Sequence, residues 1–430
     1  MTIGERSAAE LRKRLLDALP PPARDAVARI VSHGRGGVYA VGGSVRDVLL
    51  ERQLVDVDVD LVTERDAIDV ARRAMPGARI TAHARFRTAS MTVDGWRIDV
   101  ATARSERYAR PGALPRISGA SIDEDLRRRD FSVNAMALRL DGDAELLDPT
   151  GGAADARAGV IRVLHDRSFI DDATRIYRAL RYAGRLGFRI DPSTDAQLRA
   201  DVRFLDAIGG ERLRREIELV LREPVASDVL SACESAGVLR ATHAGLRWDE
   251  RRAAAFADPS VPSLPRLPYG FAVLAAGATP AVATSICERL RLKRDEAAAV
   301  DAVAALATAA AVLRRPEVKP SGAVTLFERY PAASVAAFAS TTDERIAGAL
   351  ALRYLEEWRH VRPALGGRDL LELGVPEGPQ VQRGLQLLRA ARLDGRVDDR
   401  EDETAMARRF AHGIRDARHA ATGQSGLDGH

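Results

Sequence analysis

The 430-residue sequence has few cysteines, few aromatic residues and no long apolar run. Cys233 and Cys287 cannot form the disulfide framework of a small secreted protein, and we expect both to be reduced thiols in helical segments. Aromatic residues make up 5% of the chain, too few for a groove that stacks single-stranded bases along its whole length. The longest uncharged stretch, 267–286, contains two Pro and two Gly, which favours a packed core over a membrane span.

Charge, in contrast, is abundant and almost balanced. Lysine and arginine total 65 against 61 acidic residues, and lysine occurs only at Lys13, Lys293 and Lys319. A slight positive excess is compatible with a polyanionic partner but does not require one. The first 25 residues are too charged for a secretory signal, so we expect a cytoplasmic protein without a membrane partner.

The first 150 residues differ in pattern from the rest of the chain. Short Val/Ile-rich runs with period-two alternation predict strands. They lie at 38–41, 56–63, 78–81, 87–93, 96–103 and 135–140, with short helices expected at 44–52 and 66–74. After about Gly159 long Ala/Leu/Arg segments at helical spacing follow, and proline-rich breaks near 259–268 and 315–320 indicate boundaries among them. The sequence therefore predicts an α+β head followed by an elongated helical part.

A Gly-Gly turn follows the first predicted strand and opens a helix, in the motif GGSVRD at 42–47. Without side chains, Gly42 and Gly43 let the backbone approach a bulky anion, and the first N–H groups of a helix can bind phosphate. Arg46 adds a forked cation. Such a motif alone is more often an ordinary turn, and with Arg46 it suggests a phosphate site.

Three aspartates, Asp56, Asp58 and Asp60, alternate in the next predicted strand. Side chains two apart share a face of a strand, so these carboxylates repel one another at a position where Asp is already unfavourable. Bound divalent cations would offset this cost. Mg²⁺ binds carboxylates and phosphate oxygens, so the run predicts a two-metal phosphoryl-transfer site, with Asp99 from a neighbouring strand as a further ligand. Solvated carboxylates on an edge strand are the alternative.

Three consecutive arginines, 127–129, stand before Asp130 and after a segment, 121–124, with capping-box spacing. We expect Asp130 to hold one of these arginines and another, Arg129, to be available for a triphosphate. A solvated helix face is the alternative.

Asp172 and Arg175 are expected to lie in one helix over 171–186, where the i,i+3 spacing puts them on one face. An ordinary intrahelical ion pair is one interpretation. The other is base recognition, because cytosine and adenine both present an amino donor beside an unprotonated ring nitrogen. A carboxylate accepts from the first and a guanidinium donates to the second. Guanine and uracil have the opposite order, so such a pair would select CTP and ATP.

In this order the motifs resemble the class II tRNA nucleotidyltransferases, or CCA-adding enzymes, and the related bacterial poly(A) polymerases. The segments that carry the resemblance are GGSVRD, the Asp-x-Asp run, RRDFSVNAMAL, GVIRVLHDRSFIDDATRIYRALRYAGRLGFRID, ERLRREIELVL and, more faintly, GGRDLLELGVPEGPQVQRGLQLLRAARLDG. Residues 240–360 match weakly.

The resemblance implies a polymerase-β-like nucleotidyltransferase head followed by an elongated all-α neck, body and tail. The expected boundaries are 1–155 for the N-terminal helix and head, 156–235 for the neck with the base-reading helix, 236–360 for the body and 361–430 for a tail that binds tRNA.

The activity that the resemblance implies is Mg²⁺-dependent addition of CMP and AMP from CTP and ATP to the 3′ end of tRNA, at its acceptor arm. Gly43 and Arg46 would hold the triphosphate, beside Gly42, and the Asp-x-Asp pair with Asp99 would hold metals. Arg129 would contact the incoming nucleotide. The base would be read by Asp172 and Arg175, with Arg178 and Arg181 near the nucleotide.

The sequence departs from the family pattern beside the metal run. Leu49-Leu50-Glu51 stands where the family usually has Leu-Leu-Gly, and the run is two residues longer than expected. Counting forward from the glycine motif gives Asp56 and Asp58 as the metal pair, whereas counting backward from LVTERDAI gives Asp58 and Asp60. Only Asp58 belongs to both registers.

The motifs leave several activities open. A CC-adding or A-adding partial enzyme and a poly(A) polymerase share them, and an inactive RNA-binding relative is less well supported because it needs no metal run. A small-molecule nucleotidyltransferase is a further alternative, although it would usually lack the helical part. Arginines expected to contact tRNA phosphates are Arg212, Arg214, Arg215, Arg408 and Arg409, each of which could equally be a solvated charge.

Overall fold

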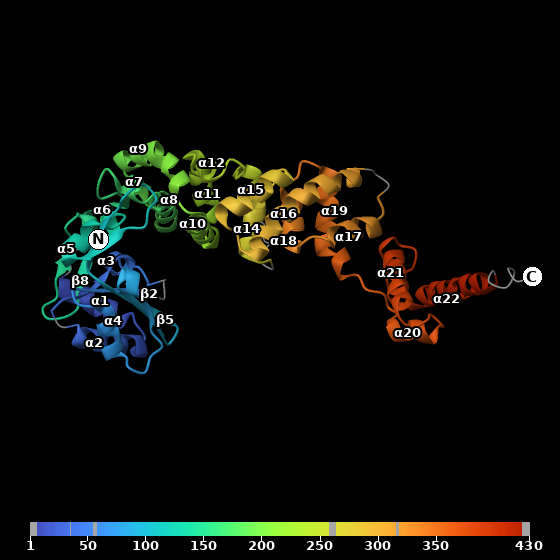
Figure 1. The fold of residues 1–430 in the computed structure, drawn as a ribbon, viewed down its shortest axis with the longest axis horizontal. Helices are drawn as coiled ribbons and strands as arrows, with labels where there is room; N and C mark the ends of the chain where they lie inside the picture. Colours follow the sequence, from blue (N-terminus) through green and yellow to red (C-terminus); the bar gives the residue numbers. More distant parts are fainter. Residues whose placement is uncertain (1–6, 35, 55–57, 258–263, 315–317, 424–430) are drawn as a thin grey trace, which may run out of the picture. The chain divides into compact units, whose positions relative to one another are not determined.

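The structure is a computed structural model that describes residues 7–34, 36–54, 58–257, 264–314 and 318–423. Its contacts divide the chain into two compact units, 1–244 and 245–430. The first unit contains a mixed β-sheet and helices, and the described part of the second is helical (Figure 1). The predicted α+β head followed by helices is confirmed. The four-part division stays a prediction beside this single boundary.

A seven-stranded sheet forms the centre of the first unit, in the order β3-β4-β5-β2-β1-β8-β9. Its strands are β1 (Val38–Val41), β2 (Asp58–Thr63), β3 (Thr81–His83), β4 (Thr88–Val93), β5 (Trp96–Thr102), β8 (Ala137–Arg139) and β9 (Leu146–Leu147). Strands β2 and β5 pair in parallel, and the other neighbours are antiparallel. The predicted strands are found, except that the run 78–81 contributes only Thr81.

Alternation along the central strands separates a packed face from an accessible one. Val59 and Leu61 on β2 and Ile98 and Val100 on β5 are buried. Between them, Asp58 and Asp60 are exposed. This period-two pattern explains why the strand tolerates its acidic residues: they all point away from the core.

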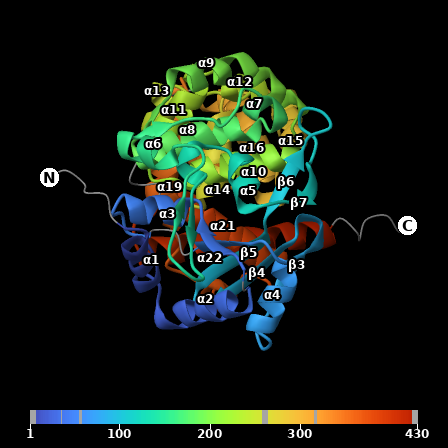
Figure 2. The same cartoon turned by 90° about the vertical axis from the view of Figure 1, so that its left-hand side faces the viewer.

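Helices α1 (Ala8–Asp17), α2 (Pro21–His33), α3 (Gly43–Leu49) and α4 (Ala67–Ala74) pack around the sheet. Figure 2 shows α2 and α4 side by side, and both contact β4. Helix α3 ends three residues earlier than the predicted segment 44–52. Glu51 follows it in a left-handed conformation, with φ of 58°. Glu51 thus occupies a backbone conformation that glycine adopts without strain.

A hairpin and a short helix that carry several site residues follow the sheet strands. Strands β6 (Arg104–Arg107) and β7 (Arg116–Gly119) pair in antiparallel fashion, and α5 (Ile122–Arg127) comes next. The capping box predicted at 121–124 is present: the Ser121 side chain accepts from the Glu124 N–H, and the Ser121 N–H donates to Glu124 Oε2 at 3.0 Å. The hairpin was not predicted.

The remaining described part of the first unit is mainly helical. Its helices are α6 (Gly152–Ala158), α7 (Ser168–Asp171), α8 (Thr174–Leu186), α9 (Pro192–Asp201), α10 (Gly210–Arg222), α11 (Ala226–Ser235) and α12 (Val238–Thr242). Helix α8 packs against α10 and α11. A small parallel pair, β10 (Val160–Ile161) and β11 (Arg189–Ile190), holds the start of this region together.

The second unit consists of packed helices in its described part. They are α13 (Glu250–Ala257), α14 (Arg266–Ala275), α15 (Pro280–Leu290), α16 (Arg294–Ala309), α17 (Pro320–Phe327), α18 (Ala332–Thr341), α19 (Arg345–Glu356), α20 (Gly367–Glu372), α21 (Pro379–Leu393) and α22 (Arg400–Gly423). Figure 1 shows α14, α16 and α18 next to one another, and all three are in contact.

One helical segment of the second unit, Arg294–Leu313, has the length and apolar composition that could cross a membrane. Half of its apolar stretch is buried within the protein, and the core helix of a soluble protein can have the same length and composition. The uncharged stretch 267–286 is divided between α14 and α15, as its prolines and glycines suggested.

Candidate active site

The first unit contains a cavity of about 710 Å³ that collects residues from the sheet, from the segment after α5, and from α8 and α10. Every predicted site residue that the structure describes lines it: Gly42, Gly43, Arg46, Asp58, Asp60, Asp99, Arg129, Asp172, Arg175, Arg178 and Arg181. Asp56 lies outside the described residues. Segments more than 120 residues apart in the sequence therefore meet at one concave site.

The glycine turn forms one edge of this cavity. Gly42 connects β1 to α3 with φ of 75°, a conformation that favours glycine. A Cβ atom on Gly42 would lie 3.6 Å from Arg129 Nη1 and 3.8 Å from Asp60 Oδ2. The bare backbone thus stands directly beside a guanidinium and a carboxylate, which leaves room for a ligand that contacts all three.

Arg46 is buried in the wall behind this turn. Its guanidinium forms an ion pair with Asp47 at 2.8 Å and donates from Nη1 to Asn134 Oδ1 at 2.7 Å. These contacts fix α3 to the segment around Asn134. The sequence predicted a cation for the triphosphate at this position, and the structure places Arg46 in the lining with its guanidinium already engaged by the protein.

The carboxylates converge across two paired strands. Asp58 and Asp60 share the exposed face of β2, and Asp60 stands opposite Asp99 in the parallel register with β5. Asp99 is also paired with Arg97 at 3.0 Å. Asp60 is exposed on the strand, but its carboxylate lies inside the cavity, and the surrounding protein raises its pKa. The charge of Arg129 lowers this pKa, and the charges of Asp99 and Asp58 raise it. This excess of negative charge is suited to a bound cation.

The donor set fits Mg²⁺ in the way that nucleotide-dependent enzymes use it. In the part of the chain that the structure describes, no group of three or more His, Cys, Asp or Glu side chains is arranged to hold a metal by itself. Mg²⁺ commonly takes only one or two protein carboxylates and completes its shell with water and substrate phosphates. Asp58 and Asp60 beside the glycine turn match this arrangement.

The three consecutive arginines are held differently from the prediction. Arg127 pairs with exposed Asp123, while Arg128 and Arg129 both pair with buried Asp125, at 2.6 and 3.0 Å. Burial opposes ionisation of Asp125, but Arg129 and Arg128 outweigh it and lower the pKa of Asp125.

The prediction that Asp130 holds one of these arginines is wrong. Asp130 lies beyond the end of α5, and its ion pair is with Arg178 on α8. Asp125 takes the predicted role because it lies in the last turn of α5, three and four residues before Arg128 and Arg129, which follow the helix end.

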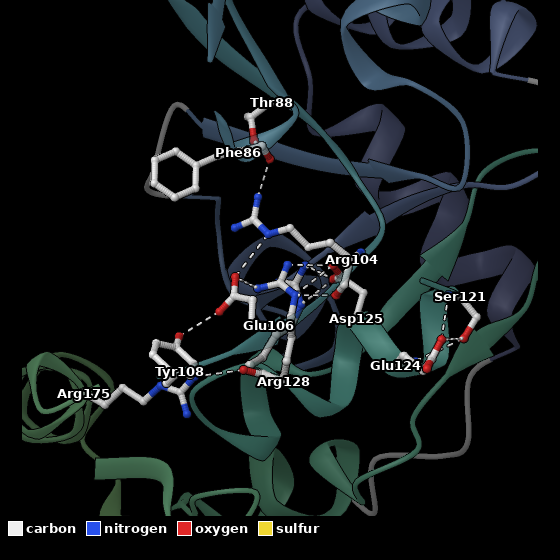
Figure 3. A network of polar contacts seen from close by, with 11 residues as sticks. Phe86, Thr88, Arg104, Glu106, Tyr108, Ser121, Glu124, Asp125, Arg128 and Arg175 are labelled. Carbon is white, nitrogen blue, oxygen red and sulfur yellow. Dashed lines mark hydrogen bonds and ion pairs between the residues drawn. The ribbon is translucent and has the colours of Figure 1, made fainter. Parts of the chain in front are cut away.

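Figure 3 shows a network that extends from the hairpin to α8. Glu106 accepts hydrogen bonds from Arg104, Arg128 and Tyr108, at 3.1, 2.8 and 2.7 Å. The carbonyl of Arg128 in turn accepts from Arg175 Nη2 at 2.9 Å. Burial and the charge of Glu106 raise the pKa of Tyr108, so its hydroxyl stays a donor. Sequence reasoning missed Glu106, Tyr108 and Asp125, because a single acidic or aromatic residue carries no local signal.

The predicted base-reading residues line the cavity, but they do not lie in one helix. Asp172 follows α7 in an extended conformation, and α8 begins only at Thr174. Asp172 Oδ1 accepts from the Thr174 hydroxyl and from Arg212 Nη2, both at 2.7 Å. The helix predicted over 171–186 is therefore wrong at its start, because the side chain of Asp172 bonds the backbone of the turn before α8.

Arg175 is anchored separately from Asp172. It is buried, and it donates from Nη1 to Ser168 Oγ at 2.8 Å and from Nη2 to the Arg128 carbonyl. The backbone N–H of Arg175 donates to the carbonyl of Asp172 at 3.0 Å, but the side-chain bonds of the two residues go to other partners. Arg212, which we expected among the phosphate-contacting arginines, instead holds Asp172 in place.

Two further arginines on α8 flank an aromatic ring. Arg178 Nε donates to Asp130 at 2.9 Å, and Arg181 Nη1 donates to Glu223 at 3.1 Å. Both guanidinium groups lie over the Tyr182 ring, at 5.4 and 4.7 Å from its centre. Each arginine is thus fixed by a carboxylate and by a cation–π contact, which holds both guanidinium groups in place.

A mixed sheet with convergent carboxylates, facing a glycine turn and arginine-rich helices, defines a nucleotidyltransferase head. The sequence matches the family described as "Poly A polymerase head domain" over residues 38–162. An A-adding tRNA nucleotidyltransferase of Geobacter sulfurreducens is 33% identical over 87% of this chain, which spans 45% of that relative's length. A CC-adding tRNA nucleotidyltransferase of Deinococcus radiodurans is 34% identical over 86% of this chain and 88% of its own.

A comparison with solved structures also finds a tRNA nucleotidyltransferase. A Thermotoga maritima CCA-adding enzyme complexed with tRNA matches with a TM-score of 0.74 and 26% identity, over 94% of this chain and 98% of its own. The chain belongs to the tRNA nucleotidyltransferase family, as the resemblance of its motifs indicated.

Proposed function

We propose that this protein adds CMP and AMP from CTP and ATP to the 3′ end of tRNA, without a nucleic-acid template. The observation that carries the proposal is one cavity lined by Asp58 and Asp60, by the glycine turn, and by Asp172 and Arg175. The names of the relatives support transfer of nucleotides to tRNA and leave the number of added nucleotides open, because they include A-adding, CC-adding and CCA-adding enzymes.

Asp58 and Asp60 are the residues that would hold Mg²⁺, with Asp99 next to them. Of the two registers left open by the sequence, we choose Asp58 with Asp60, because both line the cavity and Asp60 Oδ2 lies beside the Gly42 turn; Asp56 lies outside the described residues. When bound there, Mg²⁺ would make the 3′-hydroxyl of the tRNA more acidic and would neutralise charge on the departing pyrophosphate.

The remaining residues bind and orient the substrates. Gly42 lets the triphosphate approach the backbone, and the outer nitrogen of Arg129, Nη1, is directed toward this turn while its other nitrogens bind Asp125. Gly43 and Arg46 support the turn from behind. The tRNA hydroxyl then attacks the α-phosphorus in line, pyrophosphate leaves, and the residues themselves form no covalent bond with the substrate.

Asp172 and Arg175 would read the base. A guanidinium has five N–H groups. Arg175 uses one N–H of Nη1 on Ser168 and one N–H of Nη2 on the Arg128 carbonyl. Asp172 uses Oδ1 on Thr174 and Arg212, which leaves Oδ2 for a ligand. Both residues are therefore held in place by one part of the side chain and can bind cytosine or adenine with another.

The tRNA would lie along the helical parts of the chain. Arg215, Arg408 and Arg409 are exposed and available for phosphate contacts, whereas Arg212 and Arg214 are engaged with carboxylates. We place the activity in the cytoplasm, where tRNA maturation takes place.

A stepwise incorporation assay tests the proposal. The protein is incubated with Mg²⁺ and tRNAs that end before the first C, after CC, or with a complete CCA end, and each labelled nucleotide is supplied in turn. Addition of CTP and then ATP that stops at CCA supports the full activity. Addition of only C or only A identifies a partial enzyme, and continued addition of A identifies a poly(A) polymerase. No incorporation by the wild-type protein would overturn the proposal and favour an RNA-binding relative without activity.

A further inference from the structure

A buried glutamate on the helical side of the cavity has no role in the contacts described above. Glu216 lies on α10 and lines the cavity together with Arg178 and Arg181. Only 8% of its surface is exposed. Its Oε2 is enclosed and has no hydrogen-bond partner among the described residues. Buried carboxylates are normally paired, so an unpartnered oxygen in a cavity wall indicates a partner that arrives with the ligand.

The two neighbouring arginines bond other residues. Arg178 directs its guanidinium to Asp130 and Tyr182, and Arg181 directs Nη1 to Glu223. Burial raises the pKa of Glu216, while the charges of Arg178 and Arg181 oppose this rise. The arginines therefore stabilise the negative charge of Glu216 from a distance and leave its Oε2 without a donor.

The missing donor can be identified from the chemistry of the proposed substrates. The exocyclic amino group of cytosine or adenine carries two hydrogens, and one carboxylate oxygen accepts only one of them. Asp172 would accept the first. The second hydrogen, once enclosed in the cavity, needs an acceptor of its own. Glu216 and Asp172 line the same cavity, and the negative charge of Asp172 raises the pKa of Glu216.

We propose that Glu216 is a specificity-determining residue, whose carboxylate accepts a hydrogen bond from the exocyclic amino group of the incoming cytosine or adenine. The proposal rests on the function proposed above and adds a second acceptor to the base site. The terminal torsion of a glutamate is soft, so a small rotation turns an oxygen toward the cavity.

Two acceptors would also strengthen rejection of the wrong bases. Uracil and guanine carry a keto oxygen where cytosine and adenine carry the amino group. That oxygen has no hydrogen to donate and would face two carboxylates, which repel it. A single carboxylate at Asp172 would impose a smaller penalty.

The test uses nucleotides that differ only in the amino group. The triphosphates of 2-pyrimidinone riboside and purine riboside keep the ring nitrogen of cytosine and adenine and lack the amino group. We expect the wild-type protein to use CTP or ATP with kcat/KM about 10- to 100-fold higher than the matching analogue. In Glu216→Ala this preference should fall about tenfold, through loss of activity with CTP or ATP and little change with the analogue.

Glu216→Gln and Glu218→Gln serve as the second variant and the control. The amide of Glu216→Gln keeps an oxygen acceptor without its charge, so we expect the preference to fall about threefold. Glu218 is buried on the same helix and is paired with Arg214, and it does not line the cavity. Glu218→Gln should therefore leave the preference unchanged.

The outcomes separate this inference from the proposed function. An equal loss with the natural nucleotide and with its analogue would overturn the inference and make Glu216 a supporting residue only. If Glu216→Ala does not fold, an unchanged preference in folded Glu216→Gln overturns the inference in the same way. Wild-type protein that incorporates no nucleotide into tRNA would overturn the proposed function, and the inference with it.

Discussion

The two walls of the cavity are built in different ways. The sheet wall consists of Asp58, Asp60 and Asp99, whose positions follow from the pairing of β2 with β5. The helix wall consists of side chains on α8 and α10, of which Arg178 and Arg181 are fixed by Asp130 and Glu223 from other segments. Backbone geometry thus places the acidic groups, and ion pairs between distant residues place the basic ones. A substitution in the sheet wall should change the chemistry alone, whereas one in the supports of the helix wall should also change stability.

The largest effect is expected at the sheet wall. Asp58→Ala removes a proposed metal ligand and should lower nucleotide incorporation about 10³-fold or more at every Mg²⁺ concentration. Because Asp58 is exposed, the melting temperature should change little. Asp143→Ala removes an exposed carboxylate outside the cavity and should keep wild-type activity. Wild-type turnover by the Asp58 variant would show that the metal site lies elsewhere.

A substitution at Asp125 tests how much a buried carboxylate that holds two arginines of the cavity contributes to stability. Asp125→Asn leaves Arg128 and Arg129 without their shared buried carboxylate and should destabilise the protein by about 3–5 kcal/mol in denaturant unfolding. Asp123→Asn removes the exposed partner of Arg127 on the same helix and should cost less than about 1 kcal/mol. Equal costs for the two variants would contradict the contrast between buried and exposed support.

Asp125 should also contribute to the pH dependence of stability. Its pKa is lower in the folded protein than in the unfolded chain, where it is about 3.9. The stabilisation is therefore complete above that value and is lost as the pH falls through the folded pKa. Denaturant unfolding below about pH 5 should show a steeper loss of stability for the wild type than for Asp125→Asn. Parallel curves would show that Asp125 does not contribute.

Base selection is the next largest effect. Asp172→Ala should reduce the preference for CTP and ATP over GTP and UTP about 10- to 100-fold and change the metal dependence little. Arg212→Ala should cause a smaller loss of the same kind, because it releases Asp172 rather than removing it. Retained preference in Asp172→Ala would mean that another residue reads the base.

The smallest effect lies outside both walls, at Glu51. Its left-handed conformation is strained for any residue with a side chain, and its contact with Arg14, at 3.9 Å between exposed groups, is weak. Glu51→Gly should raise the free energy of unfolding by about 0.5–1 kcal/mol and leave incorporation unchanged. A loss of stability would show that the Arg14 contact outweighs the strain.

The contrast between the walls also explains what the sequence could predict. Alternation of Val with Asp is a local signal, and it correctly placed Asp58 and Asp60 on one exposed face. The Gly-Gly pair that predicted the turn at Gly42 is also a local signal. The pairing of Asp130 could not be predicted, because its partner Arg178 lies 48 residues away and only the packing of α8 brings the two together.

Local spacing also misplaced Asp172. Asp172 stands three positions before Arg175, which is compatible with one helix. However, its side chain accepts a hydrogen bond from the Thr174 N–H, and α8 begins only at Thr174. Glu106 carried no sequence signal at all, since its role arises from Arg128, which caps the end of α5.

The contact between Arg175 and residue 128 uses a main-chain carbonyl, an atom that every amino acid supplies. Residue 128 can therefore be replaced during evolution without depriving Arg175 of this acceptor, while its link to Asp125 and Glu106 would be lost. The other acceptor of Arg175, the hydroxyl of Ser168, has no such protection. Substitution at 168 should thus be confined to threonine, and substitution at 128 should be limited by what Asp125 and Glu106 tolerate.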